Sequence, residues 1–418
     1  MSPGRGASKP FPPAPAWVKG LEHVGVTGTN GKTSTTRFSA AALGSIARPV
    51  ASFTTVGAFL DDQPIQVTAS YRGVLDAVRS ALERGGRYAV LEVTSEVLSL
   101  GFARRWPFRA AVFTNLSHDH LDAHGSPEHY FASKAQLFNA LPRQGGLAVV
   151  NGCDDVAELL LEVTPESARR LLYGVASRGT ATLPLDASAS ACAVTLEGTR
   201  AAVTLGPALG GGSVELCTRA IGAIFLENAL AAWLLAVGLG AEPRAALAAV
   251  AGAAPPRGRF EVLAREPTVV VDYAHTPDAL RRTLDTARAL GKARVVVVFG
   301  AGGNRDKDKR PAMGAAAGAA DRVIITSDNP RDEDPKDIAA AILEAVPKTC
   351  LASVDLDRAR AIRRAVTEAG NGDIVVIAGK GHELTQTIGG VEREFSDVAV
   401  ARAALAERGG EPAGEIVP

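Results

Sequence analysis

The sequence has little of what marks a secreted, membrane-spanning or nucleic-acid-binding protein. Its 418 residues include four cysteines without a CxxC pair, so nothing suggests a disulfide framework and we interpret the thiols as reduced. Lys plus Arg and Asp plus Glu number 45 each, and this balance gives no general attraction to nucleic acid or a membrane surface. No apolar run approaches the ~20 residues that span a bilayer. These absences favour a cytoplasmic protein with neither nucleic-acid nor membrane partners.

The first twenty residues also lack the apolar middle of a signal peptide. They are rich in proline, glycine and alanine, so we expect residues 1–20 to form a disordered leader. The remainder is too long for one ordinary core, which predicts two or three domains. A hydrophobic content of 46% and a charged content of 22% are ordinary for a folded protein.

Apolar, strand-like runs alternate with helical stretches in two separate parts of the chain. In the first part, the runs at 22–27, 87–95 and 109–117 end in polar residues, as strands of a parallel sheet do at their functional edge. Pro255 and Pro256 then interrupt the pattern, and a second alternation of strands and helices begins after them. We therefore expect two α/β domains, at 21–253 and 254–418, of which the second is a doubly wound, Rossmann-like unit.

The strongest local signal is a glycine turn between the first predicted strand and the helix that follows it. Backbone N–H groups in such a turn close on phosphate, and the helix N-terminus favours negative charge. Lys32 would reach the terminal phosphates, and the Thr33 hydroxyl would reach a Mg²⁺ ion. Val26 stands where the generic P-loop has its first glycine, and the alternative is a turn that binds nothing. We expect the turn to bind ATP through Gly28, Thr29, Asn30, Gly31, Lys32, Thr33 and Ser34.

Further short motifs follow the turn in order along the chain. They are LEVTS (91–95), HDHLDAHG (118–125), FASK (131–134), RGRFE (257–261), VVVDYAH (269–275), GAGGNRDKDKRP (300–311), DNPR (328–331) and AGKGHE (378–383). Together with GTNGKT they resemble the Mur ligase family, which includes folylpolyglutamate and cyanophycin synthetases. The likeness is strongest to the branch that adds the third residue of the peptidoglycan stem peptide. It implies a P-loop-type ATP-binding domain followed by a Rossmann-like domain that binds an amino acid.

The resemblance implies a Mg²⁺ site beside the ATP phosphates. Glu92 and His120 match the family's metal-binding residues, and Lys134 matches a lysine that CO₂ carbamylates so that it helps to hold a second ion. Taken alone, the histidine-rich cluster would suggest a transition metal, and Lys134 a solvated helix lysine. The upstream phosphate loop favours Mg²⁺. We expect Thr33, Glu92, His120 and Lys134 at the metal, and Lys32, Glu92, His120 and Lys134 as the catalytic residues.

The nucleotide contacts implied by the resemblance lie in both domains. Asn228 matches an asparagine that contacts adenine, but the asparagine expected three residues earlier is Phe225. Arg259 matches a linker arginine that closes on the phosphates. Asp272 and His275 match a nucleotide-side motif, and the alternative for His275 is a hydrogen-bonded core imidazole.

The loop at 300–311 has the start of a dinucleotide fingerprint, but Arg305 occupies its last glycine position and NAD is not expected. The resemblance instead implies that Arg305 contacts the incoming amino acid. DNPR is the signature of synthetases that add meso-diaminopimelate, whereas alone it would read as a loop turn. A guanidinium grips a carboxylate in a bidentate manner, and carboxylates accept from ammonium groups. The implied contacts to the amino acid are Arg305, Asp328, Asn329, Arg331, Gly379 and Glu383.

The acceptor side departs from the family pattern. Family members normally begin with a domain that binds the UDP end of the acceptor, and we expect that domain to be absent because some twenty residues precede the first strand. The segment 67–72 replaces a Thr-Thr-Pro-like loop, and Thr94-Ser95-Glu96 replaces Ser-Ser-His, which leaves Ser95 as a matching contact. Phe102 stands where an acceptor-binding arginine is expected.

The resemblance therefore implies an ATP- and Mg²⁺-dependent acid–amino-acid ligase that forms an acyl phosphate. The first hypothesis is addition of meso-diaminopimelate to a UDP-N-acetylmuramoyl-dipeptide-like acceptor. The second is the same chemistry on a smaller acceptor without a nucleotide. The third is a non-catalytic ATP-binding partner, against which the presence of Lys32, Glu92, His120 and Lys134 argues.

Overall fold

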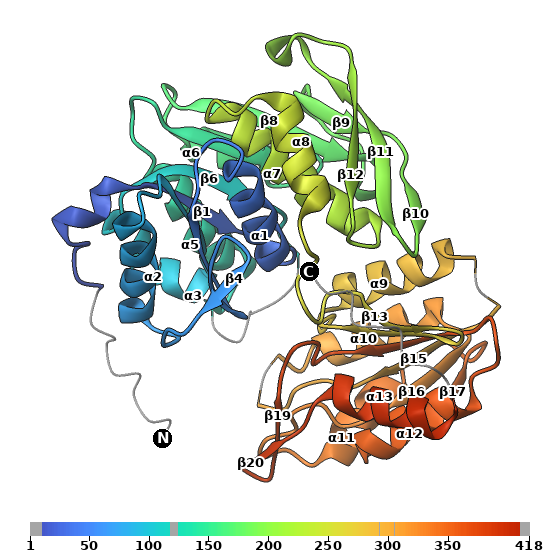
Figure 1. Ribbon diagram of the computed structural model, residues 1–418. Helices are drawn as coiled ribbons and strands as arrows, with labels where there is room; N and C mark the ends of the chain where they lie inside the picture. Colours follow the sequence, from blue (N-terminus) through green and yellow to red (C-terminus); the bar gives the residue numbers. More distant parts are fainter. Residues whose placement is uncertain (1–10, 118–123, 292, 305, 410–418) are drawn as a thin grey trace. The chain divides into compact units, whose positions relative to one another are not determined.

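The protein forms two compact units in a computed structural model that describes residues 11–117, 124–291, 293–304 and 306–409 (Figure 1). The first unit contains the described residues of 11–193 and 197–254, and the second contains those of 194–196 and 255–409. Both units are α/β, which confirms the predicted fold class. Within the described residues, no helix combines the length and the apolar character needed to cross a membrane.

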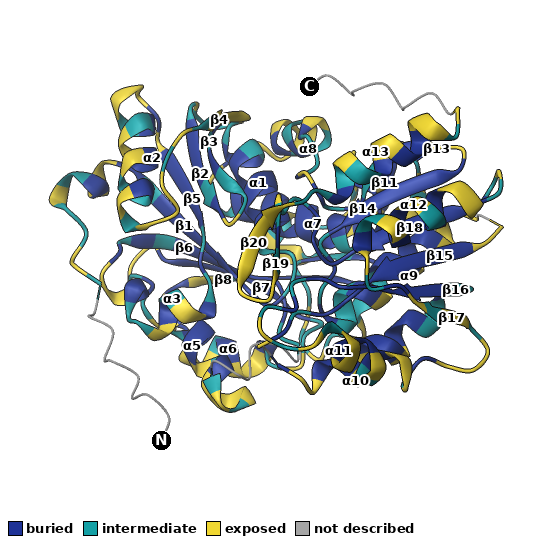
Figure 2. Cartoon of the chain, turned by 90° about the horizontal axis from the view of Figure 1, so that it is seen from below, coloured by how far each residue is buried: buried dark blue, intermediate teal, exposed yellow. Residues whose placement is uncertain are grey.

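A mainly parallel sheet forms the middle of the first unit. In spatial order its strands are β4 (Gln63–Ile65), β3 (Gly57–Leu60), β2 (Val50–Thr54), β5 (Tyr88–Glu92), β1 (Glu22–Thr27), β6 (Phe108–Phe113), β7 (Leu147–Asn151), β8 (Arg169–Val175), β9 (Ala187–Ala189) and β11 (Gly198–Leu205), with β12 (Ser213–Thr218) beside β11. The strands from β2 to β9 are parallel, and the outer strands pair in antiparallel fashion. In the sequence, the short strand β10 (Ala193–Thr195) comes after β9 and before β11. The central strands are apolar and buried because helices cover both faces (Figure 2).

The helices of the first unit form two layers. Their bounds are α1 (Lys32–Leu43), α2 (Tyr71–Glu83), α3 (Ser95–Ser99), α5 (Pro127–Asn139), α6 (Ala157–Val163), α7 (Ala223–Gly238) and α8 (Pro243–Gly252). Helices α2, α3, α5 and α6 share a hydrophobic cluster with one face of the sheet, while α1, α7 and α8 pack on one another. Helix α7 is apolar on all sides, and this pattern is typical of a buried helix.

Residues 11–20 are ordered, in contrast to the disordered leader that the composition predicts for residues 1–20. Ala16–Gly20 forms a 3₁₀ helix, and Val18 is fully buried in the cluster under α2. Phe11 packs on Tyr71 and Phe102, with ring centroids 5.9 and 5.1 Å apart. Because apolar side chains of this segment bury surface against distant parts of the chain, the segment is held in place.

A second parallel sheet organises the second unit. In spatial order its strands are β13 (Glu261–Arg265), β14 (Thr268–Asp272), β18 (Ile374–Ala378), β15 (Val295–Phe299), β16 (Arg322–Ile325) and β17 (Leu351–Val354), and only β13 is antiparallel to its neighbour. Its helices and its separate hairpin are α9 (Pro277–Ala289), α10 (Lys309–Ala316), α11 (Pro335–Leu343), α12 (Arg358–Glu368), α13 (Asp397–Glu407), β19 (Thr385–Ile388) and β20 (Val391–Glu394). Helices α12 and α13 share one hydrophobic cluster with the sheet, and α10 packs against α9 and α11. Strands β14, β15, β16 and β18 end at one edge, which is where ligands bind in open α/β sheets.

Candidate active site

The turn between β1 and α1 has a backbone that only glycine fits at two places. Gly28 has φ of 152°, and a Cβ there would lie 1.8 Å from the Thr114 hydroxyl oxygen. Gly31 has φ of 83°, and its Cβ would lie 2.4 Å from Oδ1 of Asn228. Glycine adopts such angles without steric cost and lets other groups approach closely. The turn is thus tight at both ends, as a phosphate-binding loop requires.

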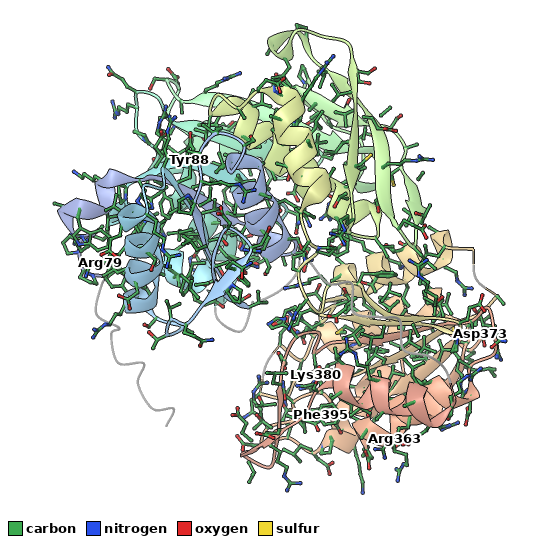
Figure 3. All side chains as sticks on the ribbon, viewed as in Figure 1. Arg79, Tyr88, Arg363, Asp373, Lys380 and Phe395 are labelled. Carbon is green, nitrogen blue, oxygen red and sulfur yellow. The ribbon has the colours of Figure 1, made fainter. Side chains whose placement is uncertain are left out.

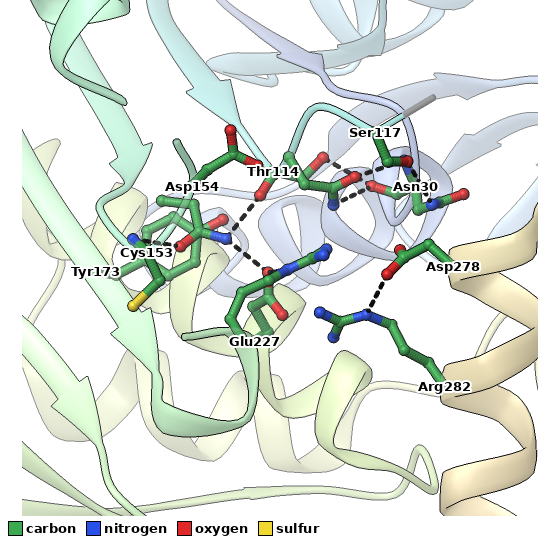
Figure 4. Close-up of polar contacts among 12 residues, drawn as sticks. Asn30, Thr114, Ser117, Cys153, Asp154, Tyr173, Glu227, Asp278 and Arg282 are labelled. Carbon is green, nitrogen blue, oxygen red and sulfur yellow. Dashed lines mark hydrogen bonds and ion pairs between the residues drawn. The ribbon is translucent and has the colours of Figure 1, made fainter. Parts of the chain in front are cut away.

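The polar atoms of the turn form hydrogen bonds within the turn and with the residues that directly follow β6. Lys32 Nζ donates to the carbonyl oxygen of Thr29 at 2.7 Å, so the amine bends back over the turn. Asn115 holds the turn by accepting from the Asn30 amide at 2.9 Å and donating to the Asn30 carbonyl at 3.0 Å. Ser34 is buried in the first turn of α1. Asn115 was not among the residues expected at the site, although it is a polar residue that follows a buried strand. Its neighbours Thr114 and Ser117 are labelled in Figure 4.

Thr33 and Glu92 meet where the metal is expected. The Thr33 hydroxyl donates to Oε2 of Glu92 at 2.9 Å, and the Thr55 amide donates to the same oxygen at 3.1 Å. A hydroxyl and a carboxylate at one point beside a phosphate turn are oxygen ligands of the kind that Mg²⁺ prefers. His120 lies outside the described residues. Among the residues that the structure describes, no three His, Cys, Asp or Glu side chains gather as a metal-binding group.

Lys134 is buried and reaches the phosphate turn. Its side chain on α5 has 1% relative exposure, and Nζ donates to the carbonyl oxygen of Gly28 at 2.7 Å. Nζ also lies 4.3 Å from the centre of the Tyr130 ring, whose hydroxyl is 3.1 Å from Oγ1 of Thr29. The alternative of a solvated helix lysine is therefore wrong. Tyr130, which joins Lys134 to the turn, was not expected at the site.

A short chain of polar contacts leads from Ser95 to the residue before Lys134. Ser95 is buried, and its hydroxyl oxygen is 2.9 Å from Nε2 of His124. Nδ1 of His124 is 3.3 Å from the hydroxyl oxygen of Ser133, the residue before Lys134. These contacts link Ser95, an expected substrate contact, to the residue before Lys134, and His124 is an additional residue of this group.

Phe102 is a core residue in this protein. Its ring centre lies 5.3 Å from that of Trp106 and 5.9 Å from that of Phe108, and Tyr71 contacts it at 6.4 Å. Only 4% of the residue is exposed. The position where the family carries an acceptor-binding arginine therefore contributes to an aromatic cluster and offers no charge.

Asn228 borders the phosphate turn from α7. Its Oδ1 faces Gly31, and its Nδ2 is buried with no hydrogen-bond partner among the described residues. A buried amide without a partner is costly, so this donor fits a ligand that supplies an acceptor, such as the ring nitrogens of adenine. Phe225, at the position of the missing asparagine, is buried.

The residue before Asn228 extends a polar network under the turn. Glu227 is 1% exposed and accepts from Nδ2 of Asn151 at 2.7 Å and from Nε of Arg178 at 3.2 Å (Figure 4). Asn151 also donates to the carbonyl oxygen of Thr114 at 2.8 Å. A single glutamate in an apolar helix gave no signal in the sequence that it would pair with residues on two other elements.

Asp272 holds the start of the second unit together. Its carboxylate accepts from the amides of Phe260 at 2.6 Å and Ala274 at 2.9 Å, and from the Thr283 hydroxyl at 3.0 Å. Burial raises the pKa of this carboxyl, and the nearby Arg259 guanidinium opposes the rise. Asp272 therefore fixes the backbone directly after Arg259 and the backbone of its own turn after β14.

Arg259 and His275 both lie against Tyr273. The Arg259 guanidinium carbon is 4.4 Å from the centre of the Tyr273 ring, and the His275 ring centre is 4.6 Å from it. Nδ1 of His275 is 2.8 Å from the Tyr273 carbonyl oxygen, and the ring is half-buried. Within the second unit the structure thus brings together the residues that were expected on the nucleotide side.

Four of the residues expected at the amino acid meet at the carboxyl edge of the second sheet. Nδ2 of Asn329 donates to Oε2 of Glu383 at 3.0 Å, which joins the loops after β16 and β18. Gly379 has φ of 115°, and a Cβ there would lie 2.6 Å from Oδ2 of Asp328. Asp328 therefore lies against Gly379, and Asn329, the next residue of the same loop, contacts Glu383.

Arg331 is held in an uncommon backbone conformation. Its φ is 54°, and its amide and carbonyl bond to Thr387 and Gly389 of the β19–β20 hairpin at 3.1 and 2.7 Å. Its Nη1 donates to the carbonyl oxygen of Gly303 at 2.5 Å. The loop that contains Gly303 is the one expected to carry a contact at Arg305, which lies outside the described residues.

An ion pair that the sequence did not reveal fixes the same two loops. Arg310 of α10 donates through Nη2 to both carboxylate oxygens of Glu333 at 3.0 Å. The Asn304 amide also donates to Glu333, at 2.5 Å. These hydrogen bonds, above all those from Arg310, lower the pKa of Glu333 from 4.5 to about 2.

The Glu333 pair predicts a pH-dependent contribution to stability. Because the pKa of Glu333 is lower in the folded than in the unfolded protein, the pair stabilises the fold above about pH 4.5, and this stabilisation is lost as the pH falls toward 2. Glu333→Gln should therefore lower the Tm at pH 7, and the difference from wild type should shrink through that range. Thermal unfolding at several pH values measures it, with exposed Glu344→Gln as the control. A Tm difference that stays constant from pH 7 to pH 3 would contradict the assignment.

Comparison with known proteins agrees with this geometry. The Mur ligase middle domain matches residues 26–236, and the domain described as "Mur ligase, glutamate ligase domain" matches residues 258–381. The UDP-N-acetylmuramoyl-L-alanyl-D-glutamate--2,6-diaminopimelate ligase of Chlorobaculum tepidum is 42% identical over 402 residues, which cover 92% of this chain and 76% of that protein. The ligase of the same name from Aquifex aeolicus is 36% identical over 396 residues, covering 92% and 77%.

Solved structures give the same result. The structure of a UDP-N-acetylmuramoyl-L-alanyl-D-glutamate--2,6-diaminopimelate ligase aligns with a TM-score of 0.64 at 34% identity, covering 94% of this chain and 79% of that one. The Mycobacterium tuberculosis folylpolyglutamate synthase in complex with ADP aligns at 0.69 with 20% identity, covering 94% and 92%, and shows the shared fold. The chain therefore belongs to the Mur ligase family, whose members are ATP-dependent ligases that form an amide bond and release ADP.

Proposed function

We propose that this chain adds meso-diaminopimelate to a UDP-N-acetylmuramoyl-dipeptide in the cytoplasm, with ATP and Mg²⁺, during the synthesis of peptidoglycan precursors. The observation that carries the proposal is the group formed by the loops after β16 and β18. Asp328, Asn329 and Glu383 meet there beside Gly379, and Arg331 anchors the same loop. The names of the relatives support this choice of substrates.

The residues of the first unit are suited to phosphoryl transfer. An oxygen of the acceptor carboxylate attacks the terminal phosphorus of ATP, ADP leaves, and an acyl phosphate results. Lys32 and the amides of the turn would hold the phosphates, while Thr33 and Glu92 would hold Mg²⁺ together with His120. When bound, Mg²⁺ neutralises the negative charge of the phosphates. Because Lys134 reaches Gly28, its carbamate would stand at the same end of the turn.

The residues of the second unit are suited to the amine substrate. The amine attacks the acyl carbon, a proton is lost from the nitrogen, and phosphate leaves as the amide forms. Arg331 would pair with the distal carboxylate of meso-diaminopimelate, and Asp328 and Glu383 would accept from its ammonium groups. Charge-assisted hydrogen bonds of both signs at one place suit an amino acid whose far end is itself zwitterionic.

A second candidate is the same ligation with a smaller acceptor that carries no nucleotide. The observation that favours it is Phe102, which occupies the position of an acceptor-binding arginine and lies in an aromatic cluster. The amino-acid side is the same in both candidates. The acceptor therefore distinguishes them.

Phosphate release from ATP, measured for a matrix of carboxylate acceptors and amino acids, tests the proposal. We expect release that depends on both UDP-N-acetylmuramoyl-dipeptide and meso-diaminopimelate. Phosphate release with a small acceptor, but not with UDP-N-acetylmuramoyl-dipeptide, would favour the second candidate. Phosphate release that does not depend on meso-diaminopimelate would overturn the assignment of the amino acid. No release with any pair of acceptor and amino acid would overturn the assignment of the activity.

The proposed carbamate predicts a specific defect. Lys134→Ala should be nearly inactive, because the anionic group beside the phosphates is lost, and short-chain carboxylates such as acetate should partly restore turnover. Turnover is measured in buffers with and without bicarbonate. The control is Lys19→Ala, an exposed lysine of the same unit, which should behave as wild type. A Lys134→Ala enzyme with full activity in bicarbonate-free buffer would rule the carbamate out.

A further inference from the structure

Lys380 is a buried cation that none of the roles described above uses. It follows Gly379 at the end of β18, and its side chain has no exposed surface (labelled in Figure 3). Nζ lies 2.8 Å from Oε2 of Glu383 and 3.2 Å from Oδ1 of Asn329. The amine therefore contacts two residues that are proposed to hold the amino acid.

Glu383 is paired with a buried cation, and Asp328 is the second carboxylate of this group. Asn329 donates to the same Glu383 oxygen that Lys380 contacts, so Oε2 already has two donors. In the other buried pair nearby, Arg358 donates to Asp397 through two bonds of 2.7 Å and also to the carbonyl oxygen of Ala378 at 2.9 Å, and the pair adds no net charge. The negative charge of Glu383 is thus matched within the protein before any ligand arrives.

We propose that Lys380 is a specificity-determining positioning residue, which neutralises Glu383 so that the subsite favours a zwitterionic end over a lone ammonium group. This inference rests on the proposed function. An unpaired Glu383 would attract any substrate with a distal ammonium, lysine included, by simple charge attraction. With Lys380 beside it, Glu383 attracts an incoming ammonium less strongly, and Asp328 is left as the carboxylate of this group that can balance such a charge. Meso-diaminopimelate brings both charges and keeps the balance.

A purely structural role for Lys380 is the alternative, because the amine also ties Asn329 to Glu383. Two substitutions separate the roles. Lys380→Gln keeps two N–H donors for the same oxygens but removes the charge, whereas Lys380→Arg keeps the charge and changes the shape. If the charge matters, only Lys380→Gln should alter the preference between the two amino acids. If the role is structural, Lys380→Arg should alter that preference at least as much as Lys380→Gln.

The experiment measures kcat/KM for meso-diaminopimelate and for L-lysine with the full chain, ATP, and whichever acceptor proves active. We expect Lys380→Gln to narrow the preference for meso-diaminopimelate by on the order of 10-fold, the scale of one close charge pair, mainly through a lower KM for lysine. Lys380→Arg should keep the wild-type ratio. A wild type that prefers lysine would overturn the proposed function itself. A wild type that prefers meso-diaminopimelate, with an unchanged ratio in Lys380→Gln, would overturn this inference alone.

Glu383→Gln tests the same charge from the other side and does not depend on how well the Lys380 variants fold. It leaves Lys380 as an excess cation, so lysine should lose more kcat/KM than meso-diaminopimelate and the ratio should widen. A ratio that narrows or stays the same would contradict the charge balance. Circular dichroism and thermal unfolding of each variant show which of them are folded.

Discussion

Lys32→Ala should lower kcat by on the order of 10²-fold or more and leave the fold intact. Lys32 is half-buried at the first position of α1, and its amine bends back to the carbonyl oxygen of Thr29 at 2.7 Å. The side chain thus serves the phosphate turn and packs into no core. Removing one fixed positive group from a site where negative charge develops typically costs this much in rate. Steady-state phosphate release at saturating substrates measures the loss.

Two comparisons make the Lys32 result interpretable. Lys32→Arg keeps the charge and should retain more activity than the alanine variant, although the larger guanidinium will not fit the turn as well. Asn115→Ala removes the side chain that holds Asn30 and should weaken ATP binding without removing any charge. Near-normal turnover by Lys32→Ala would mean that the turn does not handle the transferred phosphate.

The fold was predictable because its signals are local. The central strands of both sheets are short apolar runs, and each half of the chain alternates such runs with helices. Residues 11–20 were not predictable in this way. Their order depends on contacts with residues such as Tyr71 and Arg79, whose guanidinium lies 4.8 Å from the ring centre of Trp17. Composition alone cannot indicate contacts between segments so far apart.

The candidate site divides along the same line. The phosphate turn is one continuous stretch of sequence, and the DNPR loop is another. Their motifs could therefore be recognised, although the roles of their residues remain predictions. The partners that hold these motifs come from elsewhere. Lys134 meets Gly28 from 106 positions away, and Arg310 meets Glu333 from 23 positions away. A lysine or an arginine on a helix is usually solvated, so burial of these two could be learned only from the structure.

The amino acid preference should depend on Arg331. Meso-diaminopimelate and lysine differ by one carboxylate, and a guanidinium aimed at that carboxylate discriminates between them because it is left unpaired when lysine binds. Among the described residues, the Arg331 side chain makes one hydrogen bond, to Gly303, although a guanidinium has five N–H donors. Its backbone is fixed on both sides by the β19–β20 hairpin. The side chain is therefore held in place with donors to spare.

Arg331→Ala should raise the KM for meso-diaminopimelate strongly and leave the KM for ATP nearly unchanged. It should also lower the ratio of kcat/KM for meso-diaminopimelate to kcat/KM for lysine. A hydrogen-bonded charge can discriminate between two substrates by on the order of 10⁴-fold. This value is the upper limit of the preference for meso-diaminopimelate that the variant can lose. Steady-state kinetics with both amino acids on wild type and variant measure the change, and thermal unfolding shows whether the loop's bond to Gly303 also matters for stability. Arg363→Ala, an exposed arginine of the same unit, is the matched control and should leave both ratios untouched. If Arg331→Ala keeps the wild-type preference, then DNPR in this chain is a loop turn held by its hairpin, and the carboxylate is recognised elsewhere.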